Sequence, residues 1–237
     1  MTQHFRALLL AAGFGTRLRP ITLKPPKCLV PIREEPLLSH WLKKLELAGC
    51  VSVLINTHYL AEQVEDFLNT WQSSTMAIQT VHEPKLLGTA GTLLANQRFF
   101  EGETGLLVHA DNLMSGDVKD FLVAHHQRQA TCLLTMLTFM SNTPSSCGIV
   151  EIDHHDVVQA FHEKVSNPPG NRANGALYAF EQHVFDYLGQ MKPKPSDFST
   201  EVIPKLLGRI QTWHTVDPYI DIGTPEALAS AQQLLGN

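Results

Sequence analysis

Small residues and cations lie close together near the start of the chain. The turn at residues 12–16, A-G-F-G-T, follows an apolar run at residues 7–11. Arg17, Arg19 and Lys27 come after this turn. A strand that runs into a glycine turn brings backbone N–H groups to the carboxyl edge of a sheet, where they bind anionic oxygens. Fixed cations on both sides of such a turn favour a polyphosphate over a carboxylate, so the stretch predicts a phosphate-binding site.

This stretch does not match either of the common phosphate-binding fingerprints. The dinucleotide fingerprint G-x-G-x-x-G needs a third glycine where this chain has Leu18, and a Walker A loop needs a G-K-[ST] that does not follow. The glycines alone fit a tight strand-to-loop crossing with solvated cations equally well. Arg17 and Lys27 shift the interpretation to phosphate binding, because a plain crossing has no need of cations on both sides.

Two acids that are far apart in the sequence each stand at the edge of an apolar segment. Asp111 follows the apolar run at residues 106–110, and Asp221 precedes the G-T-P turn at residues 223–225. A carboxylate at the carboxyl end of a parallel strand lies over the crevice where ligands bind in open α/β sheets. Each acid is equally suited to cap or brace the element that follows it, so the residues alone leave both interpretations open.

Strands and helices alternate along the first half of the chain. Residues 51–56 read as a parallel strand and residues 76–82 as a further strand, and residues 37–49 and 59–71 have helical periodicity. A further helix is expected from residue 89 to residue 100. This alternation predicts an α/β fold with a Rossmann-like, mostly parallel open sheet and helices on both faces.

The second half of the chain is expected to add a smaller β portion. A strand is predicted at residues 106–112 and a helix at 118–128, and residues 147–152 and 157–161 read as a β-hairpin. Residues 192–199 carry two prolines and several polar residues, which predicts a loop and suits a mobile flap near a substrate.

The composition describes an ordinary globular protein. The 237 residues are 43% hydrophobic and 17% charged, and the net charge of −5 argues against a nucleic-acid binder. No apolar run reaches the roughly 20 residues that cross a membrane. The four cysteines form no C-x-x-C pair, and the start of the chain does not read as a secretory signal, so a cytoplasmic location is expected. The oligomeric state stays open, a homo-oligomer included.

The pattern as a whole resembles the nucleotidyltransferases that join a nucleoside triphosphate to a sugar 1-phosphate. Their signature reads roughly L-A-x-G-x-G-T-R-L-x-P and then P-K-x-x-x-P, which this chain has at residues 10–20 and 26–31. An L-G-T-A-G turn at residues 87–91, an E-K pair at residues 163–164 and a D-x-G-T sequence at residues 221–224 also match that family.

The resemblance implies a role for each matched residue. Arg17 and Lys27 would neutralise phosphate charge, and Asp111 and Asp221 would hold Mg²⁺, the implied cofactor; Arg17, Lys27 and Asp111 are the implied catalytic set. The implied nucleotide-binding residues are Ala11, Ala12, Gly13, Gly15, Thr16, Gly88, Thr89 and Ala90. The implied sugar-phosphate-binding residues, several of them in the small β-hairpin portion, are Asn112, Gly148, Glu163, Lys164 and Asn174.

The implied reaction is attack by a sugar 1-phosphate oxygen on the α-phosphorus of the triphosphate, with release of pyrophosphate. The L-G-T-A-G turn and the compact length look most like mannose-1-phosphate guanylyltransferases. Thymidylyl or uridylyl transfer to glucose 1-phosphate, and cytidylyl transfer to a non-sugar phosphate, are alternatives. A catalytically silent nucleotide-binding regulatory module is the alternative of a different class. The resemblance covers about residues 5–230 and predicts one nucleotidyltransferase domain over residues 1–237, without a C-terminal β-helix domain.

Overall fold

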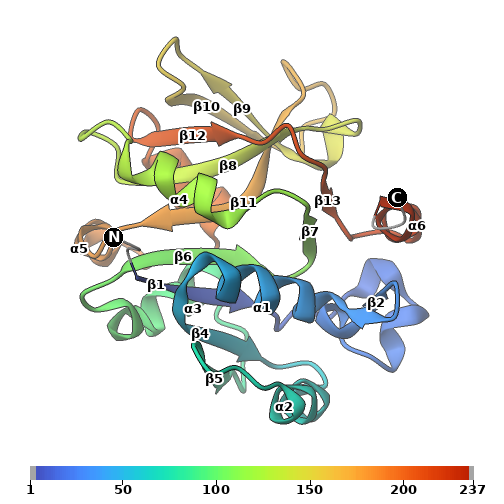
Figure 1. Ribbon diagram of the computed structural model, residues 1–237. Coiled ribbons are helices and arrows are strands. Elements are labelled where there is room, and N and C mark those ends of the chain that lie inside the picture. Colours follow the sequence, from blue (N-terminus) through green and yellow to red (C-terminus); the bar gives the residue numbers. More distant parts are fainter. Residues whose placement is uncertain (1–3, 235–237) are drawn as a thin grey trace. The chain divides into compact units, whose positions relative to one another are not determined.

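A computed structural model describes residues 4–234 (Figure 1). The chain divides into two compact units. The first unit comprises three stretches of sequence: the chain up to residue 86, residues 108–118, and the chain from residue 217. The second unit comprises residues 87–107 and 119–216. The single nucleotidyltransferase domain expected from the sequence stays a prediction, and each unit is described separately.

Three parallel strands form the centre of the first unit. They are β1 (Phe5–Leu10), β4 (Cys50–Thr57) and β5 (Ala77–His82), with β4 paired to both of the others. Helix α1 (Leu37–Ala48) leads into β4, and helix α2 (Ala61–Thr70) joins β4 to β5. The side chains of β1 and β4 are almost all buried, as expected for parallel strands that are covered on both faces. The alternation of strands and helices predicted from the sequence is therefore present here.

The late part of the chain completes the first unit. Strand β13 (Tyr219–Asp221) pairs antiparallel with β7 (Asn112–Met114), while β2 (Pro31–Ile32) pairs with β3 (Glu35–Pro36). Helix α6 (Pro225–Leu234) follows β13. A buried hydrophobic cluster joins these elements, and it contains Leu18, Ile32, Leu37, Leu113, Ile222 and Ala231. The residues after the glycine turn and the residues near the end of the sequence thus share one core.

The second unit is built on a mainly antiparallel sheet. Its strands lie in the order β10 (Val158–Glu163), β9 (Gly148–Ile152), β11 (Arg172–Phe180), β8 (Leu134–Met140) and β12 (Ile210–His214). Only the β8–β12 pairing is parallel among the described pairings of these strands. Strands β9 and β10 form the hairpin that the sequence predicts.

Helices and helical turns accompany this sheet. Helix α4 (Val118–His126) begins with the last residue of the first unit and continues into the second, and α5 (His183–Gln190) follows β11. A π-helical turn at Phe198–Val202 runs directly into a 3₁₀ turn at Ile203–Lys205. Residues 198–205 therefore form two short, irregular helical turns.

Helix α3 is shorter than the sequence predicts. It spans Thr89–Ala95 and does not continue to Phe100; a separate 3₁₀ turn at Gln97–Phe100 follows it. The side-chain Nδ2 of Asn96 donates a hydrogen bond to the carbonyl oxygen of Thr92 at 2.8 Å. Asparagine favours such local bonds over a continuing helix, which explains the early end.

The strand expected at residues 106–112 is interrupted. Strand β6 (Thr104–His109) runs from the second unit into the first and ends before Ala110, whose backbone N–H donates to the carbonyl oxygen of Leu10 at 3.2 Å. The chain then enters β7 at Asn112. Asp111 therefore lies in the turn between two strands, close to the end of β1.

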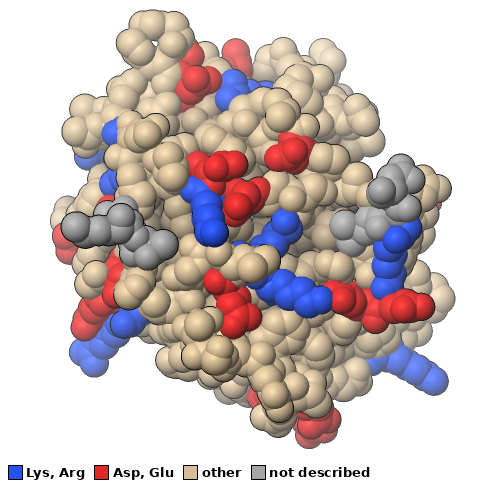
Figure 2. Space-filling view, viewed as in Figure 1, with Lys and Arg blue, Asp and Glu red and all other residues tan. Residues whose placement is uncertain are grey.

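The surface carries charges of both signs. Figure 2 shows Lys and Arg side chains interspersed with Asp and Glu side chains on the face in view, in keeping with a net charge of only −5. Among residues 4–234, none of the helices combines the length and the apolar character that crossing a membrane requires.

Candidate active site

The glycine turn of the first unit contains two glycines in different surroundings. Gly15 adopts a left-handed conformation with a φ of 61°, and Thr22 Oγ1 donates a hydrogen bond to its carbonyl oxygen at 2.7 Å. A Cβ at Gly15 would lie 3.0 Å from Thr22 Cγ2 and 3.1 Å from Lys27 Cβ, whereas nothing lies within 4 Å of a Cβ at Gly13. Gly15 therefore allows the turn to close, and Gly13 leaves open space in front of the backbone.

A buried polar network supports the base of this turn. The backbone N–H of Ala11 donates to Asn56 Oδ1 at 2.8 Å, and Asn56 Nδ2 donates to Glu83 Oε1 at 3.0 Å. These residues follow or end β1, β4 and β5, so the network links the carboxyl ends of the three parallel strands. Asn56 is 4% exposed and Glu83 is 3% exposed. The sequence interpretation singled out neither residue.

The two acids predicted from the sequence converge on one lysine. Lys27 Nζ lies 2.6 Å from Asp111 Oδ2 and 3.6 Å from Asp221 Oδ1. Backbone pairing fixes this arrangement, because Asp221 is opposite Asn112 in the β13–β7 ladder and the N–H of Ile222 donates to the carbonyl oxygen of Asp111 at 3.0 Å. Two carboxylates that share an ammonium group form a position that attracts a cation.

Charge keeps Asp111 ionised despite its surroundings. Burial acts to raise the pKa of Asp111, but the Lys27 ammonium, together with His109, outweighs burial and holds the pKa below its ordinary value. The Lys27 side chain is only 10% exposed and its ammonium group donates directly to the carboxylate. The site therefore presents a stable negative charge beside a fixed positive charge at neutral pH.

Arg17 completes the cationic side of the site. Its Nη2 lies 3.9 Å from Asp221 Oδ2, and both side chains are about half exposed, at 60% and 48%. A Cβ at Gly223 would lie 2.8 Å from Arg17 Nη1, so the glycine makes room for the guanidinium group. The groups enclose a cavity of about 220 Å³ lined by Gly13, Gly15, Thr16, Arg17, Leu18, Lys27, Asp111 and Gly223.

In the second unit, the L-G-T-A-G turn opens helix α3. Gly88 has a φ of +79°, and the backbone N–H groups of Ala90 and Gly91 donate to the carbonyl oxygen of Ser196 at 2.9 and 3.2 Å. Ala90 is fully buried, Thr89 is partly buried and Gly88 is exposed. Of the three residues predicted to bind the nucleotide here, Gly88 is thus the most accessible, while Ala90 helps to hold the turn in place.

Three of the predicted sugar-phosphate residues lie together at the β9–β10 hairpin. A Cβ at Gly148 would lie 2.7 Å from Glu163 Oε2, so the carboxylate rests against bare backbone. Lys164 Nζ lies 3.1 Å from Glu163 Oε1, and the backbone N–H of Lys164 donates to the carbonyl oxygen of Cys147 at 3.1 Å. The Lys164 side chain is 61% exposed, which leaves its ammonium group accessible to a ligand.

Asn174 is placed on β11 and is already engaged. Its Nδ2 donates to the hydroxyl oxygen of Tyr178 at 2.7 Å, and its Oδ1 accepts from the N–H of Ala176 at 2.9 Å. Burial raises the pKa of the Tyr178 hydroxyl, so this group is neutral and stays a hydrogen-bonding partner. Asn174 is therefore held in one orientation by its neighbours.

Comparison with known proteins places this arrangement in a family. The family model described as nucleotidyl transferase matches residues 6–237. The chain belongs to the nucleotidyl transferase family. It is 31% identical over 229 residues to a mannose-1-phosphate guanylyltransferase of Mycobacterium tuberculosis, covering 95% of this chain and 63% of that protein. It is also 31% identical over 230 residues to the mannose-1-phosphate guanylyltransferase catalytic subunit beta of Drosophila melanogaster, covering 93% of this chain and 60% of that protein.

The chain thus spans about three fifths of the length of these curated relatives. A Bacillus anthracis crystal structure, named as a candidate glucose-1-phosphate thymidylyltransferase, superposes with a TM-score of 0.86 at 22% identity. That match covers 97% of this chain and 94% of the other. The predicted α/β, Rossmann-like fold is confirmed by this likeness.

For a nucleotidyl transferase domain, the structure brings together most of the residues predicted in the first unit. The glycine turn, Arg17, Lys27 and Asp111 line one cavity. Asp221 lies beside it, within 3.6 Å of Lys27 Nζ and 3.9 Å of Arg17 Nη2. Asn112 lies beside Asp221 in the ladder but is 4% exposed, and its carbonyl oxygen accepts from Trp41 Nε1 at 2.7 Å. Ala11 and Ala12 are also buried, so they support the turn from behind.

Proposed function

We propose that this protein transfers a nucleotidyl group from a nucleoside triphosphate to a sugar 1-phosphate, giving a nucleoside diphosphate sugar and pyrophosphate. One observation carries the proposal: Asp111 and Asp221 converge on Lys27 beside an open glycine turn. Carboxylates, a lysine and bare backbone N–H groups suit the binding of a metal-complexed triphosphate. The names of the relatives support the same reaction class.

The donor set fits a magnesium ion. Mg²⁺ prefers oxygen ligands and usually takes one or two carboxylates, with waters and substrate phosphates filling the remaining positions. Asp111 and Asp221 would hold it, and the Lys27 ammonium between them indicates that this position favours positive charge. When bound, the ion supplies charge neutralisation and orientation of phosphate oxygens.

The residues of the first unit then act on the triphosphate. An oxygen of the sugar 1-phosphate attacks the α-phosphorus, the bond from that phosphorus to the bridging oxygen breaks, and pyrophosphate leaves with the electron pair. Arg17 and Lys27 stabilise the charge that builds up on the leaving pyrophosphate. The attacking phosphate is already an anion near neutral pH, so the reaction needs positioning and charge stabilisation without a general base.

The residues of the second unit act on the other parts of the substrates. Lys164 binds the phosphate of the sugar 1-phosphate. Glu163 accepts hydrogen bonds from sugar hydroxyl groups, and the Asn174 amide accepts from them or donates to them. Gly88 offers its exposed backbone to the nucleoside. Each of these assignments rests on the positions of the matched motifs and on the accessible groups described above.

Guanylyl transfer to mannose 1-phosphate is the proposed specific reaction. Its support is the L-G-T-A-G turn and the names of the two relatives described above. The alternative is uridylyl or thymidylyl transfer to glucose 1-phosphate, since a UTP–glucose-1-phosphate uridylyltransferase of Synechocystis is 29% identical over 234 residues.

A pyrophosphate-release assay tests the proposal. The protein is incubated with Mg²⁺ and with GTP, UTP, dTTP or CTP, each combined with mannose 1-phosphate or glucose 1-phosphate. We expect turnover that requires both substrates, is fastest with GTP and mannose 1-phosphate, and stops when EDTA removes the metal. The absence of turnover with every pair would contradict the proposed activity, and a faster rate with UTP or dTTP would move the assignment to the alternative.

An aspartate variant separates an enzyme from a silent nucleotide-binding module. We expect Asp111→Asn to lower kcat by about two to three orders of magnitude, because metal-assisted charge stabilisation contributes several kcal/mol to the transition state. Nucleotide binding, measured by calorimetry, should fall much less. Asp66→Asn, in the exposed face of α2, is the matched control and should keep full activity. A fully active Asp111→Asn variant would remove Asp111 from the mechanism.

A further inference from the structure

The L-G-T-A-G turn does not hold its conformation by itself. The N–H groups of Ala90 and Gly91 both donate to the carbonyl oxygen of Ser196, and a Cβ at Gly88 would collide with that same oxygen. The first N–H groups of a helix have no partners within the helix, so a distant carbonyl that accepts two of them fixes the helix start. Ser196 therefore sets the position of the turn from more than one hundred residues away in the sequence.

A second bond joins the same two segments. The backbone N–H of Phe198 donates to Thr89 Oγ1 at 2.7 Å, and the Phe198 ring is 1% exposed, packed 4.5 Å from the Tyr178 ring. Residues 196–198 thus bind the turn through two backbone groups, the Ser196 carbonyl oxygen and the Phe198 N–H. The turn can keep its shape only if this segment keeps its own.

The side chain of Glu201 holds residues 196–197 in place. Its Oε2 accepts hydrogen bonds from the backbone N–H of Ser196 at 2.6 Å and from the backbone N–H of Asp197 at 3.1 Å. These bonds to backbone N–H groups lower the pKa of the Glu201 carboxyl group, so it is ionised at neutral pH. A carboxylate that accepts two backbone N–H bonds is a strong local anchor.

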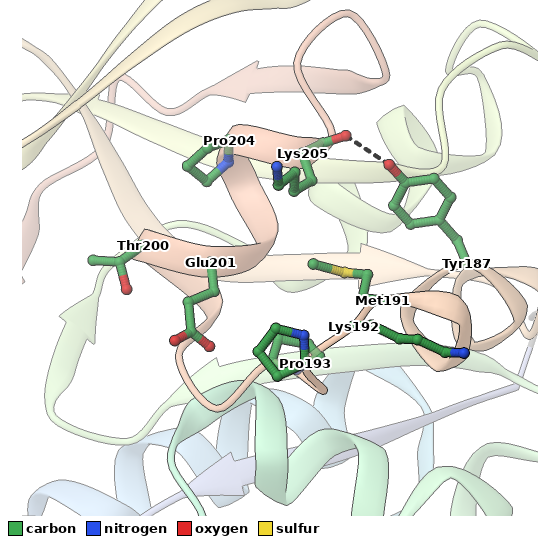
Figure 3. A pocket seen from close by; sticks show the side chains of 9 residues that line it. Tyr187, Met191, Lys192, Pro193, Thr200, Glu201, Pro204 and Lys205 are labelled. Carbon is green, nitrogen blue, oxygen red and sulfur yellow. Dashed lines mark hydrogen bonds between the residues drawn. The ribbon is translucent and has the colours of Figure 1, made fainter.

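On the side of this loop where Glu201 lies, few packed side chains could hold residues 196–197 if the bonds to Glu201 were lost. Glu201 and Pro195 line a pocket of about 450 Å³, so side chains do not fill that space. Figure 3 shows Glu201 and Tyr187 among the side chains around this pocket, with Tyr187 bonded to the carbonyl oxygen of Lys205 at 2.8 Å. Tyr187 therefore lines the same pocket, and its hydroxyl group bonds to Lys205, which lies outside residues 196–198.

We propose that Glu201 is a positioning residue for nucleotide binding: it fixes Ser196 and Asp197, and the Ser196 carbonyl fixes the turn at residues 88–91. This inference rests on the proposed function, because it takes that turn to face the nucleotide. Glu201 does not touch the substrate in this scheme. Through the backbone of residues 196–198, it determines how tightly the turn binds the nucleotide and which base the turn prefers.

Steady-state kinetics of Glu201→Ala, Glu201→Gln and Tyr187→Phe test the inference. We expect Glu201→Ala to raise the KM for the nucleoside triphosphate about tenfold, the usual effect of losing one strong hydrogen bond. The KM for the sugar phosphate and kcat should change less than twofold. Glu201→Gln keeps an acceptor oxygen and should recover most of the affinity, and Tyr187→Phe should match the wild type.

Amide hydrogen exchange gives a readout that does not depend on catalysis. In Glu201→Ala, the N–H groups of Ala90 and Gly91 should exchange faster than in the wild type, while the amides of β8 stay protected. Equal exchange at these two amides, or a rise in the KM of both substrates together, would overturn the inference. A wild type without any turnover would instead contradict the proposed function, and the exchange experiment would still decide whether Glu201 holds the turn.

Discussion

At the scale of single residues, the two glycines of the first turn separate backbone strain from ligand contact. Gly15 has a positive φ and almost no room for a Cβ, while a Cβ at Gly13 meets open space. We expect Gly15→Ala to lower the free energy of unfolding by about 1–2 kcal/mol. Gly13→Ala should change it by less than about 0.5 kcal/mol while weakening triphosphate binding, because its methyl group enters the cavity. Urea unfolding and calorimetric titration measure the two effects, and equal stability of both variants would contradict the strain argument.

The same scale shows which functional residues a sequence reveals. Lys27, Asp111 and Asp221 were predictable because chemistry restricts the residue types at those positions to cations and acids, and a recognisable motif surrounds each one. Asn56 and Glu83 were not predictable, since a polar residue at the end of an apolar strand carries no motif. Their role depends on the strand register that sets Asn56 opposite Leu10, and on the burial that the register produces.

At the scale of elements, a buried histidine joins helix α4 to the sheet of the second unit. His125 is fully buried; its Nδ1 lies 2.9 Å from Thr135 Oγ1 and its Nε2 lies 3.2 Å from Glu181 Oε1. Burial, with help from Arg128, lowers the pKa of His125 below its ordinary value, although Glu181 opposes the shift. The folded state therefore resists a proton that the unfolded state accepts.

This shift predicts how stability depends on pH. The folded pKa is lower than the unfolded pKa of about 6.5, so the contribution is complete above that pH and is lost as pH falls below it. Between pH 7 and pH 5, we expect the wild type to lose more unfolding free energy than His125→Gln, by up to about 1.4 kcal/mol per pH unit. Urea unfolding at several pH values measures this, and identical pH profiles would show that His125 takes up its proton without hindrance in the folded state.

Helices and strands were predictable where the spacing of apolar side chains defines them. Contacts made by backbone atoms were less predictable. The apolar runs of β1 and β4 and the amphipathic pattern of α1 follow directly from side-chain spacing. Ser196 binds the L-G-T-A-G turn through its carbonyl oxygen. Every residue type has this group, so no sequence pattern indicates the contact. The loop at residues 192–199 was expected to suit a flap, and its last part proves to be fastened by Glu201.

At the scale of the whole molecule, residues that are far apart in the sequence come together at the site. The first unit collects three separate stretches of sequence, and the cavity takes Lys27 from the first, Asp111 from the second and Gly223 from the third. Asp221, also from the third stretch, lies beside the cavity, with its Oδ1 3.6 Å from Lys27 Nζ. Local sequence patterns indicate each residue but not which other residues lie next to it in the fold. The family resemblance supplied that information, because a motif set that recurs in order implies a shared fold.

Ligand binding should therefore stabilise the whole chain through residues that come from all three stretches. A ligand that binds only the native state adds about 2.7 kcal/mol at one hundred times its dissociation constant. For a chain of this size that corresponds to a rise in Tm of roughly 5–10 °C. We expect GTP with Mg²⁺ to give this rise in the wild type and in Lys43→Met, whose lysine pairs with Glu35 on an exposed surface of α1. Lys27→Met should show almost no rise relative to its own ligand-free Tm, because the variant lacks the cation that faces the phosphates and orders both acids. A rise in Lys27→Met as large as in the wild type would place the triphosphate away from Asp111 and Asp221, and the proposed mechanism would then fail.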